Sequence, residues 1–245
     1  MGTACSTKLA VFMSEYLKVH GVVWHSDGIF EIQFDRGEIE FTPGDCLALF
    51  AGDSKTSRPY SIASGTCEDR LRFIVRKMDN GIVSSYLSTR APGEQVKASP
   101  PFGWFRPGPR DDHAPFVFIA TGTGISPFFA HLRSFPNDPP AQCLYGVRFV
   151  QEAVDLDRLR RQCDLRLAVS RESAPGHHHG RVTDLLEEMP VTSDTHYYLC
   201  GLDTMIDDVT NWLEKRGTSI TNIHRECFFN ASHDAATAPM AGDLA

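Results

Sequence analysis

One short segment of the 245-residue chain carries side chains whose types and spacing suit a flavin. Arg58-Pro59-Tyr60-Ser61 places a permanent cation, a flat ring and a hydroxyl almost next to one another. The guanidinium could pair with a phosphate, the ring could stack on an aromatic system, and the hydroxyl could hydrogen-bond a reactive ring edge.

A second segment, Thr121-Gly122-Thr123-Gly124, suits a dinucleotide. It follows an apolar run and precedes a helical pattern, with Pro127 near the first helical position, where a missing amide hydrogen costs nothing. Backbone amides at such a helix start point toward a pyrophosphate. Because Pro127 replaces the third glycine of the usual fingerprint, the segment alone fits an ordinary strand-to-helix turn equally well. Both segments, in this order, indicate hydride transfer between a nicotinamide and a flavin.

Elements of two kinds are expected to position these segments. Before residue 100, short apolar or alternating stretches are separated by turn residues, which predicts an antiparallel barrel or sandwich with strands near 28–34, 46–50 and 71–75. After residue 115, apolar runs alternate with helical ones, which predicts a doubly wound parallel sheet. Its expected strands are 116–120, 142–146, 164–169 and 196–200, and its expected helices are 127–135, 155–162, 183–188 and 205–216.

A proline-rich segment over residues 100–112 suits neither class and predicts the domain boundary. We expect a flavin-binding β-barrel domain over 1–110, a nicotinamide-binding α/β domain over 111–230 and a polar tail over 231–245.

Composition excludes several classes of function. The net charge of −7 argues against a nucleic-acid partner. No apolar run reaches the roughly 20 residues of a membrane helix, and the N-terminus lacks a secretory signal, so a cytoplasmic protein without a membrane partner is expected. The seven cysteines show no spacing for zinc or an iron–sulfur cluster and fit a reducing compartment. The run His177–His179 is expected to be a solvated loop rather than a metal site. We expect a monomer.

The ordered motifs resemble the ferredoxin–NADP(H) reductase family of flavoproteins. Besides the two segments above, Gly81-Ile82-Val83-Ser84 is similar to the family's Gly-x-x-Ser segment, and Cys200-Gly201 to the Cys-Gly pair that ends its last strand. The linker 101–105 also looks like the family's connection, and the resemblance runs from about residue 8 to residue 230. It implies an N-terminal antiparallel β-barrel that binds FAD and a doubly wound parallel-sheet domain that binds NADP(H).

On the flavin side, the resemblance implies a role for each residue of the first segment. Arg58 would pair with the FAD phosphate, Tyr60 would stack against the isoalloxazine, and Ser61 would hydrogen-bond near its reactive nitrogen. Ser84 and the amides after Gly81 would hold the pyrophosphate. The remaining expected flavin contacts are Pro59, Ile74, Val75, Arg76, Ile82 and Val83.

On the nicotinamide side, the resemblance implies that the 121–124 loop binds the dinucleotide and that Cys200 and Gly201 lie by the nicotinamide ring. Cys200 could also be a small buried residue that ends a strand. The expected catalytic residues are Ser61, Cys200 and Glu226, the last as a proton relay, although a surface ion pair would explain Glu226 equally well. Phe229 could shield the flavin or belong to the core.

The choice of coenzyme follows from the end of one expected strand. Ser170 and Arg171 offer a hydroxyl and a guanidinium where a ribose 2′-phosphate would bind, whereas a free 2′-hydroxyl would prefer a carboxylate. NADP(H) is therefore favoured over NADH, with Arg181 as a second cation. Arg148 could reach the pyrophosphate or cover a strand end.

Without a cluster of its own, the chain is expected to exchange single electrons with a separate ferredoxin or flavodoxin beside the flavin edge. A series of basic residues in the first half could face an acidic partner, or could be a solvated strand surface. Two alternatives stay open. One is an NADH-dependent reductase component of an oxygenase or a flavin reductase, and the other is a redox-silent binding module.

Overall fold

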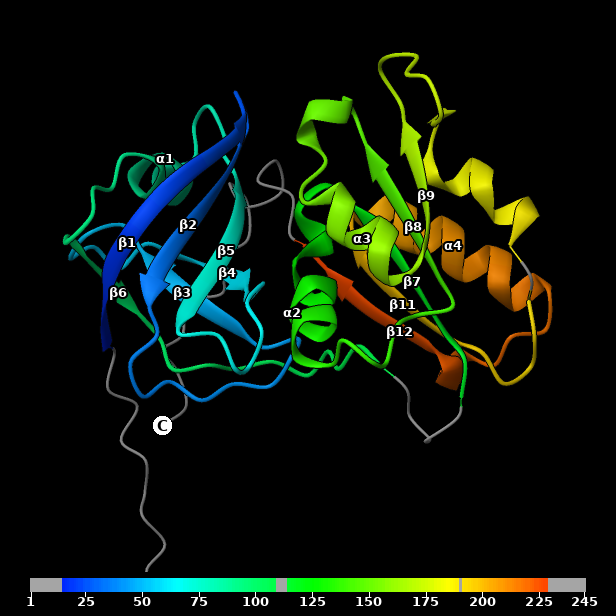
Figure 1. The fold of residues 1–245 in the computed structure, drawn as a ribbon, viewed down its shortest axis with the longest axis horizontal. Helices are drawn as coiled ribbons and strands as arrows, with labels where there is room; N and C mark the ends of the chain where they lie inside the picture. The colour runs from blue at the N-terminus through cyan, green and yellow to red at the C-terminus, as the bar shows by residue number, and fades with distance from the viewer. Residues whose placement is uncertain (1–14, 109–113, 190, 229–245) are drawn as a thin grey trace, which may run out of the picture.

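The computed structural model describes residues 15–108, 114–189 and 191–228, which form two lobes (Figure 1). The first lobe is an antiparallel six-stranded sheet with the order β4-β3-β6-β1-β2-β5. Its elements are β1 (Glu15–Ser26), β2 (Ile29–Asp35), β3 (Cys46–Phe50), β4 (Ser57–Ser61), β5 (Arg70–Arg76), α1 (Ile82–Ser88) and β6 (Gln95–Ala98).

This sheet closes on itself. The amide of Ala63, just after β4, donates to the carbonyl of Arg72 in β5 at 2.8 Å, so the chain that follows one edge strand meets the other edge strand. Alternate residues of β2 (Phe30, Ile32 and Phe34) point into the core of the lobe, as the two-residue period of a strand requires. The antiparallel β-barrel expected for the flavin domain is confirmed.

The second lobe is a six-stranded sheet in the order β10-β9-β8-β7-β11-β12, and every strand pair in it is parallel. Its strands are β7 (Phe116–Thr121), β8 (Gln142–Val147), β9 (Asp164–Val169), β10 (His178–His179), β11 (His196–Gly201) and β12 (Ile223–Cys227). Its α-helices are α2 (Ser126–Ser134), α3 (Leu156–Gln162) and α4 (Asp203–Lys215). Shorter 3-10 helices are η1 (Gly122–Ile125), η2 (Val150–Glu152), η3 (Val182–Glu188) and η4 (Ile220–Asn222).

Both faces of this sheet are covered, which explains why its strands are almost uniformly apolar. Phe118 in β7 belongs to the cluster with α2 and α3, whereas its neighbours Val117 and Ile119 belong to the cluster with η3 and α4. Figure 1 shows α2 and α3 on the near face of the sheet and α4 on the far face. The predicted doubly wound parallel sheet is confirmed.

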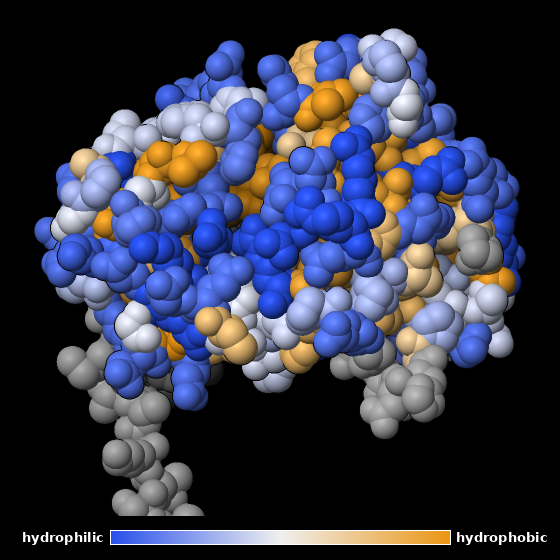
Figure 2. Space-filling view, in the orientation of Figure 1, coloured by the Kyte–Doolittle hydropathy of each residue, from blue (hydrophilic) through white to orange (hydrophobic). Residues whose placement is uncertain are grey.

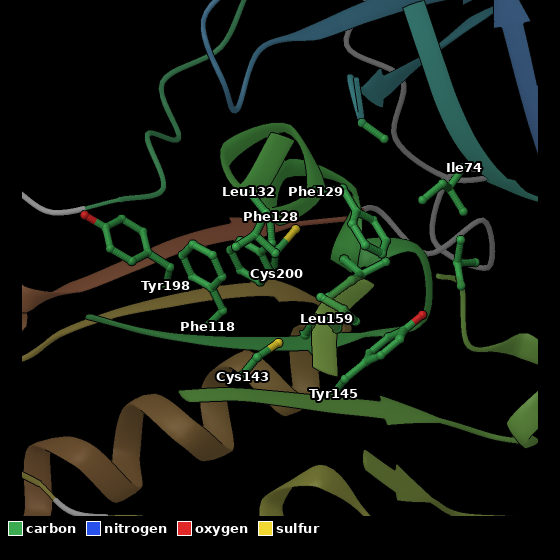
Figure 3. Packing of buried hydrophobic residues seen from close by; sticks show 14 of the residues in the cluster. Ile74, Phe118, Phe128, Phe129, Leu132, Cys143, Tyr145, Leu159, Tyr198 and Cys200 are labelled. Carbon is green, nitrogen blue, oxygen red and sulfur yellow. The ribbon is translucent and has the colours of Figure 1, made fainter. Parts of the chain in front are cut away.

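The two lobes share one apolar cluster. In it the ring of Phe118 stacks on that of Phe128, with centroids 4.2 Å apart, and Ile74 of the barrel strand β5 belongs to the same cluster, on the far side of Phe129 in Figure 3. Figure 2 shows a largely hydrophilic face with apolar surface between the lobes in the upper part of the view. The lobes are therefore held together partly by burial of hydrophobic side chains from both.

The predicted strands at 46–50 and 164–169 have the bounds of β3 and β9. The segment expected as a helix over 183–188 is the 3-10 helix η3, and the strands β1, β4, β6 and β12 were not predicted individually. The expectation of a loop at His177–His179 was wrong in part, because His178 and His179 pair in parallel with the end of β9 as the short edge strand β10.

The predicted boundary between residues 110 and 111 lies outside the described residues and stays a prediction, as does the tail over 231–245. Within the described ranges, no helix combines the length and apolar character needed to cross a membrane.

Candidate functional site

Three residues predicted to be catalytic meet where the two lobes join. Ser61 is the last residue of β4, and Cys200 and Glu226 lie opposite each other in β11 and β12. The Ser61 hydroxyl donates to Glu226 Oε2 at 3.2 Å, and the Cys200 thiol donates to the same oxygen at 3.7 Å. Residues that are 165 positions apart in the chain therefore contact one another through one carboxylate.

Cys46 completes this cluster and was not predicted to have a role. It lies opposite Ser61 in the β3–β4 pair, with its sulfur 3.4 Å from Ser61 Oγ and 3.7 Å from Glu226 Oε1. The sequence placed a strand at 46–50, but the partner strand β4 and its register were not predicted. Register is what brings Cys46 beside Ser61, so no signal in the single sequence could have found this contact.

Burial and hydrogen bonding have opposite effects on the pKa of the Glu226 carboxyl. Burial raises the pKa of this carboxyl, and donation from Ser61, Cys200 and Cys46 lowers it, with a further lowering from the Arg106 guanidinium. Arg106 is itself held by Asp45, with Arg106 Nη2 2.8 Å from Asp45 Oδ1. Burial also raises the pKa of the Cys200 thiol, so Cys200 is a neutral donor at neutral pH rather than a thiolate.

The flavin-type segment lies on the edge strand β4. Arg58 and Pro59 are exposed, Tyr60 is half-buried, and Ser61 is buried, so the cation, the ring and the hydroxyl are presented at increasing depth along the strand. Burial raises the pKa of the Tyr60 phenol to about 12, against the opposing effect of Arg58, so Tyr60 stays neutral. This donor set fits the phosphate and ring system of a flavin nucleotide.

The Gly-x-x-Ser segment forms the start of α1. Ser84 is buried, and its hydroxyl accepts a hydrogen bond from the Met78 amide at 3.1 Å. A Cβ at Gly81 would lie 2.4 Å from Ser84 Oγ, so this turn leaves no room for a side chain. Of the neighbouring predicted contacts, Val83 is buried and Ile82 is 65% exposed.

The predicted dinucleotide loop packs directly against the end of β11. Gly122 has φ +55°, and a Cβ at Gly124 would lie 2.3 Å from the Cys200 carbonyl oxygen. Gly201 has φ +139°, and a Cβ there would lie 2.2 Å from Thr121 Oγ1. Such close approach requires glycine at both positions and packs the loop directly against the end of β11, as in the glycine-rich turns that bind a pyrophosphate. The residues at 121–124 therefore fit a nicotinamide dinucleotide.

A buried ion pair connects the two lobes beside this loop. Arg76, at the end of β5, places Nη1 and Nη2 at 3.0 and 3.2 Å from the two carboxylate oxygens of Glu152 in η2. Arg148 donates to the same carboxylate, with Nε 3.0 Å from Oε1. Burial by itself would raise the pKa of Glu152, but hydrogen bonds from Arg148 and Arg76 lower it to about 2. Glu152 was not predicted to have a role, and it binds two of the arginines predicted to contact cofactors, Arg76 and Arg148.

The residues predicted to select the coenzyme form a separate group at the carboxyl end of β9. The amides of Ser170 and Arg171 donate to the carbonyls of Val147 and Arg148, which holds this turn against the end of β8. Ser170, Arg171 and Arg181 are all exposed. Among the residues that the structure describes, neither Arg171 nor Arg181 forms an ion pair, so both guanidiniums are available to an anion.

The remaining predicted residues are placed as follows. Ile74 and Val75 are buried in β5, where Ile74 packs against the shared apolar cluster and Val75 belongs to the barrel core. Phe229 lies outside the described residues, so its role as a flavin shield stays a prediction. No group of three or more metal-ligating side chains comes together among the described residues.

Comparison with known proteins gives matches for both lobes. Residues 16–106 match the model of the oxidoreductase FAD-binding domain, and residues 118–211 match that of the oxidoreductase NAD-binding domain. The toluate 1,2-dioxygenase electron transfer component of Pseudomonas putida is 27% identical over 202 residues, covering 78% of this chain and 60% of that protein. The chain thus spans about three fifths of such electron transfer components. Ferredoxin–NADP reductase B of Sorangium cellulosum is 32% identical over 199 residues, covering 72% of this chain and 81% of that protein.

Solved structures of other proteins are similar to both lobes of this chain. The crystal structure of a cytochrome P450 reductase from Amycolatopsis has a TM-score of 0.79 and 26% identity, over 89% of this chain and 71% of that one. A ferredoxin–NADP⁺ reductase from Neisseria gonorrhoeae with bound FAD and NADP has a TM-score of 0.77 at 20% identity, over 88% and 99% of the two chains, which shows the shared fold. Together with the two domain matches, this similarity shows that the chain belongs to the ferredoxin–NADP(H) reductase family of flavoproteins, with an FAD-binding domain followed by a NAD-binding domain of the oxidoreductase type.

Proposed function

We propose that this protein is an FAD-dependent ferredoxin or flavodoxin–NADP(H) reductase. It would exchange hydride between NADPH and FAD, and single electrons between FAD and a separate ferredoxin or flavodoxin. The observation that carries the proposal is the contact of Ser61 with Glu226, because it joins the flavin-type strand β4 to the nicotinamide-type strand β12 through a hydrogen bond of 3.2 Å. A redox-silent module would have no need of this polar contact at the junction.

Bound FAD would supply the chemistry that connects a two-electron hydride donor to a one-electron partner. Arg58 would hold its phosphate, Tyr60 would stack on its ring system, and Ser84 would contribute to the pyrophosphate site. Since Ser61 Oγ lies 3.2 Å from Glu226 Oε2, a proton held by Glu226 would be relayed through the Ser61 hydroxyl, which takes that proton as it gives its own to a neighbouring acceptor. Cys200, beside the same carboxylate, would contact the nicotinamide ring and orient it.

The preference for NADPH rests on the exposed group at the end of β9. Arg171 and Arg181 place two guanidinium groups at this end of the sheet, where they could bind an anion. A carboxylate there would favour a free 2′-hydroxyl, but that of Glu172 accepts a hydrogen bond from the Val150 amide at 2.6 Å. A ribose 2′-phosphate satisfies guanidiniums through charge-assisted hydrogen bonds. This arrangement supports NADPH as the physiological coenzyme.

The partner of this protein is proposed on the same basis. The motifs and fold supply sites for FAD and a dinucleotide, and a one-electron carrier would have to be a separate ferredoxin or flavodoxin. We further propose a cytoplasmic location, because the six described cysteines are free thiols, as in reducing compartments.

A second candidate function is favoured by a specific observation. Several related proteins are named as electron transfer or reductase components of dioxygenases and monooxygenases, including those that act on toluate and anthranilate. The protein could therefore be the reductase component of an oxygenase and use NADH. The Arg171 and Arg181 pair favours the NADPH-dependent reductase over this alternative.

Anaerobic rapid mixing tests both candidates. The purified protein, reconstituted with FAD, is mixed with NADPH or NADH at matched concentrations, and the loss of flavin absorbance is followed. Faster bleaching with NADPH supports the reductase, and faster bleaching with NADH supports the oxygenase component. Failure to bind FAD would exclude both.

A further inference from the structure

Cys46 occupies a position that the proposed function leaves unexplained. It is the first residue of β3, is 7% exposed, and faces Ser61 across the β3–β4 pair. Cys200 and Glu226 face each other in the same way across the β11–β12 pair. The cluster is thus built from two in-register pairs, one from each lobe, and Cys46 is the member that brings a second thiol to the carboxylate.

The two oxygens of the Glu226 carboxylate have different partners. Oε2 accepts from Ser61 Oγ at 3.2 Å and from Cys200 Sγ at 3.7 Å. Oε1 accepts from Cys46 Sγ at 3.7 Å, and the structure records no other side-chain donor to this oxygen among the described residues. A carboxylate held at one oxygen can rotate about its terminal bond, whereas one held at both cannot. Cys46 is therefore the group that fixes the plane of the carboxylate.

The state of the Cys46 thiol decides what it can do. Burial, followed by the nearby Glu226 charge, raises the pKa of Cys46 to about 12, so the sulfur carries its proton at every physiological pH. A reactive cysteine has the opposite property, a lowered pKa in a cationic and partly exposed setting. Cys46 is thus a hydrogen-bond donor and not a nucleophile.

We propose that Cys46 is a positioning residue for Glu226, whose thiol holds Oε1 while Ser61 holds Oε2, so that the carboxylate is oriented and its charged form is favoured. The inference rests on the proposed function, in which Ser61 and Glu226 pass a proton beside the flavin. A thiol is a weaker donor than a hydroxyl. It therefore orients the carboxylate while leaving Glu226 able to take up a proton.

The charged and titratable groups around Glu226 come from three parts of the chain. They are Cys46 on β3, Cys200 on β11, Arg106 in the connection between the lobes, and Asp45, which neutralises Arg106 across 2.8 Å. The Arg106–Asp45 pair is unchanged by a substitution at position 46. A shift in the titration of Glu226 after such a substitution would therefore report the loss of the thiol.

The first test is an infrared titration of the Glu226 carboxyl in the FAD-loaded protein, with the spectrum of Glu226→Gln subtracted. In Cys46→Ala, the midpoint is expected to rise by about one pH unit, because one donor to the charged form is lost. In Cys46→Ser, whose hydroxyl still donates, the midpoint should equal or fall below that of the wild type. If the Glu226 carboxyl has the same titration midpoint in Cys46→Ala as in the wild type, the proposal is overturned.

Two further variants serve as controls for this test. Cys46→Val removes the donor without leaving a cavity and should titrate like Cys46→Ala, so a cavity in the smaller variant cannot mimic the result. Cys143→Ala removes a buried thiol from β8 that is not among the side chains recorded as donating to Glu226 in the described part of the chain, and should titrate like the wild type. A shift in Cys143→Ala equal to that in Cys46→Ala would contradict the proposal.

Kinetics give a second readout. The pH profile of flavin bleaching should move with the infrared midpoint in Cys46→Ala and be restored in Cys46→Ser, while KM for the dinucleotide is unchanged. A change in KM with an unshifted pH profile would assign Cys46 a packing role and overturn the proposal. If the FAD-loaded wild type fails to bleach at all, the proposed function fails, and the infrared titration of the same protein, which needs no turnover, still decides the role of Cys46.

Discussion

In the barrel the candidate side chains lie along strands, whereas in the parallel sheet they lie where strands end. Arg58, Tyr60 and Ser61 occupy one strand, β4, and strand geometry sets which of them is exposed and which is buried. In the other lobe, Thr121 and Gly201 are the last residues of β7 and β11, and the glycines of the turn after β7 pack against the backbone of β11.

The difference lies in which atoms make the site. The barrel presents side chains, so a substitution there should change chemistry while the fold survives. The parallel sheet presents backbone at the carboxyl ends of its strands, where ligands of such sheets bind, so a substitution there should disturb structure and binding together. Four substitutions can break or sharpen this contrast.

The largest effect is expected at the backbone site. Gly124→Ala places a methyl group 2.3 Å from the Cys200 carbonyl oxygen, so β11 and the loop must separate. We expect the free energy of unfolding in urea to fall by about 3 kcal/mol and dinucleotide binding to be lost. Gly21→Ala in the barrel strand β1 is the control, because its methyl group would meet nothing within 4 Å. Equal stability of the two variants would contradict the contrast.

The next effect concerns a barrel side chain. Ser61→Ala removes the donor to Glu226 Oε2, and we expect the rate of flavin bleaching by NADPH to fall about a hundredfold with FAD still bound. The unfolding free energy should change by less than about 1 kcal/mol. Ser57→Ala, on the same strand, should bleach at the wild-type rate. A rate for Ser61→Ala within twofold of the wild type would remove Ser61 from the catalytic residues.

The third prediction concerns the ion pair that joins the two regions. Because the pKa of Glu152 in the folded protein is about 2, below the ordinary 4.5, its stabilisation is fully present above pH 4.5 and is lost as the pH falls toward 2. We expect Glu152→Gln to be roughly 2 kcal/mol less stable than the wild type at pH 7, allowing for the partly exposed arginines.

Urea unfolding of the wild type and of Glu152→Gln between pH 7 and pH 3 measures the difference in their unfolding free energies. This difference should become smaller below pH 4.5. The matched control is Glu188→Gln, which removes an exposed partner of Arg166 and should show little difference at any pH. If the difference in unfolding free energy between the wild type and Glu152→Gln stays constant down to pH 3, the charge of Glu152 adds no stability.

The smallest effect is expected at the exposed arginines. Arg171→Ala should raise KM for NADPH about tenfold by removing one charge-assisted hydrogen bond, and leave KM for NADH unchanged. Arg160→Ala, an exposed arginine on α3, is the control. An equal rise in KM for both coenzymes would place Arg171 away from the 2′-phosphate.

Periodicity and turn residues were enough to predict both fold classes, because each sheet imposes its own pattern on the sequence. Alternation along 28–34 and 71–75 reflects a barrel with one buried face, and the uninterrupted apolar run at 116–120 reflects a sheet covered on both faces. The short strands β4 and β12 were missed as elements, because β4 carries the polar flavin-type segment and β12, at the sheet edge, has three consecutive polar residues, His224, Arg225 and Glu226.

By itself, the sequence determined the order of the motifs, the two classes of sheet and the residues able to contact FAD and a dinucleotide, since these depend on residue type and local spacing. Only the tertiary structure decided which of these residues meet. The contacts of Cys46, Ser61 and Cys200 with Glu226, and those of Arg76 and Arg148 with Glu152, depend on strand register and on the packing of one lobe against the other. The residues in each contact come from different strands or lobes, and no local rule relates their positions in the chain.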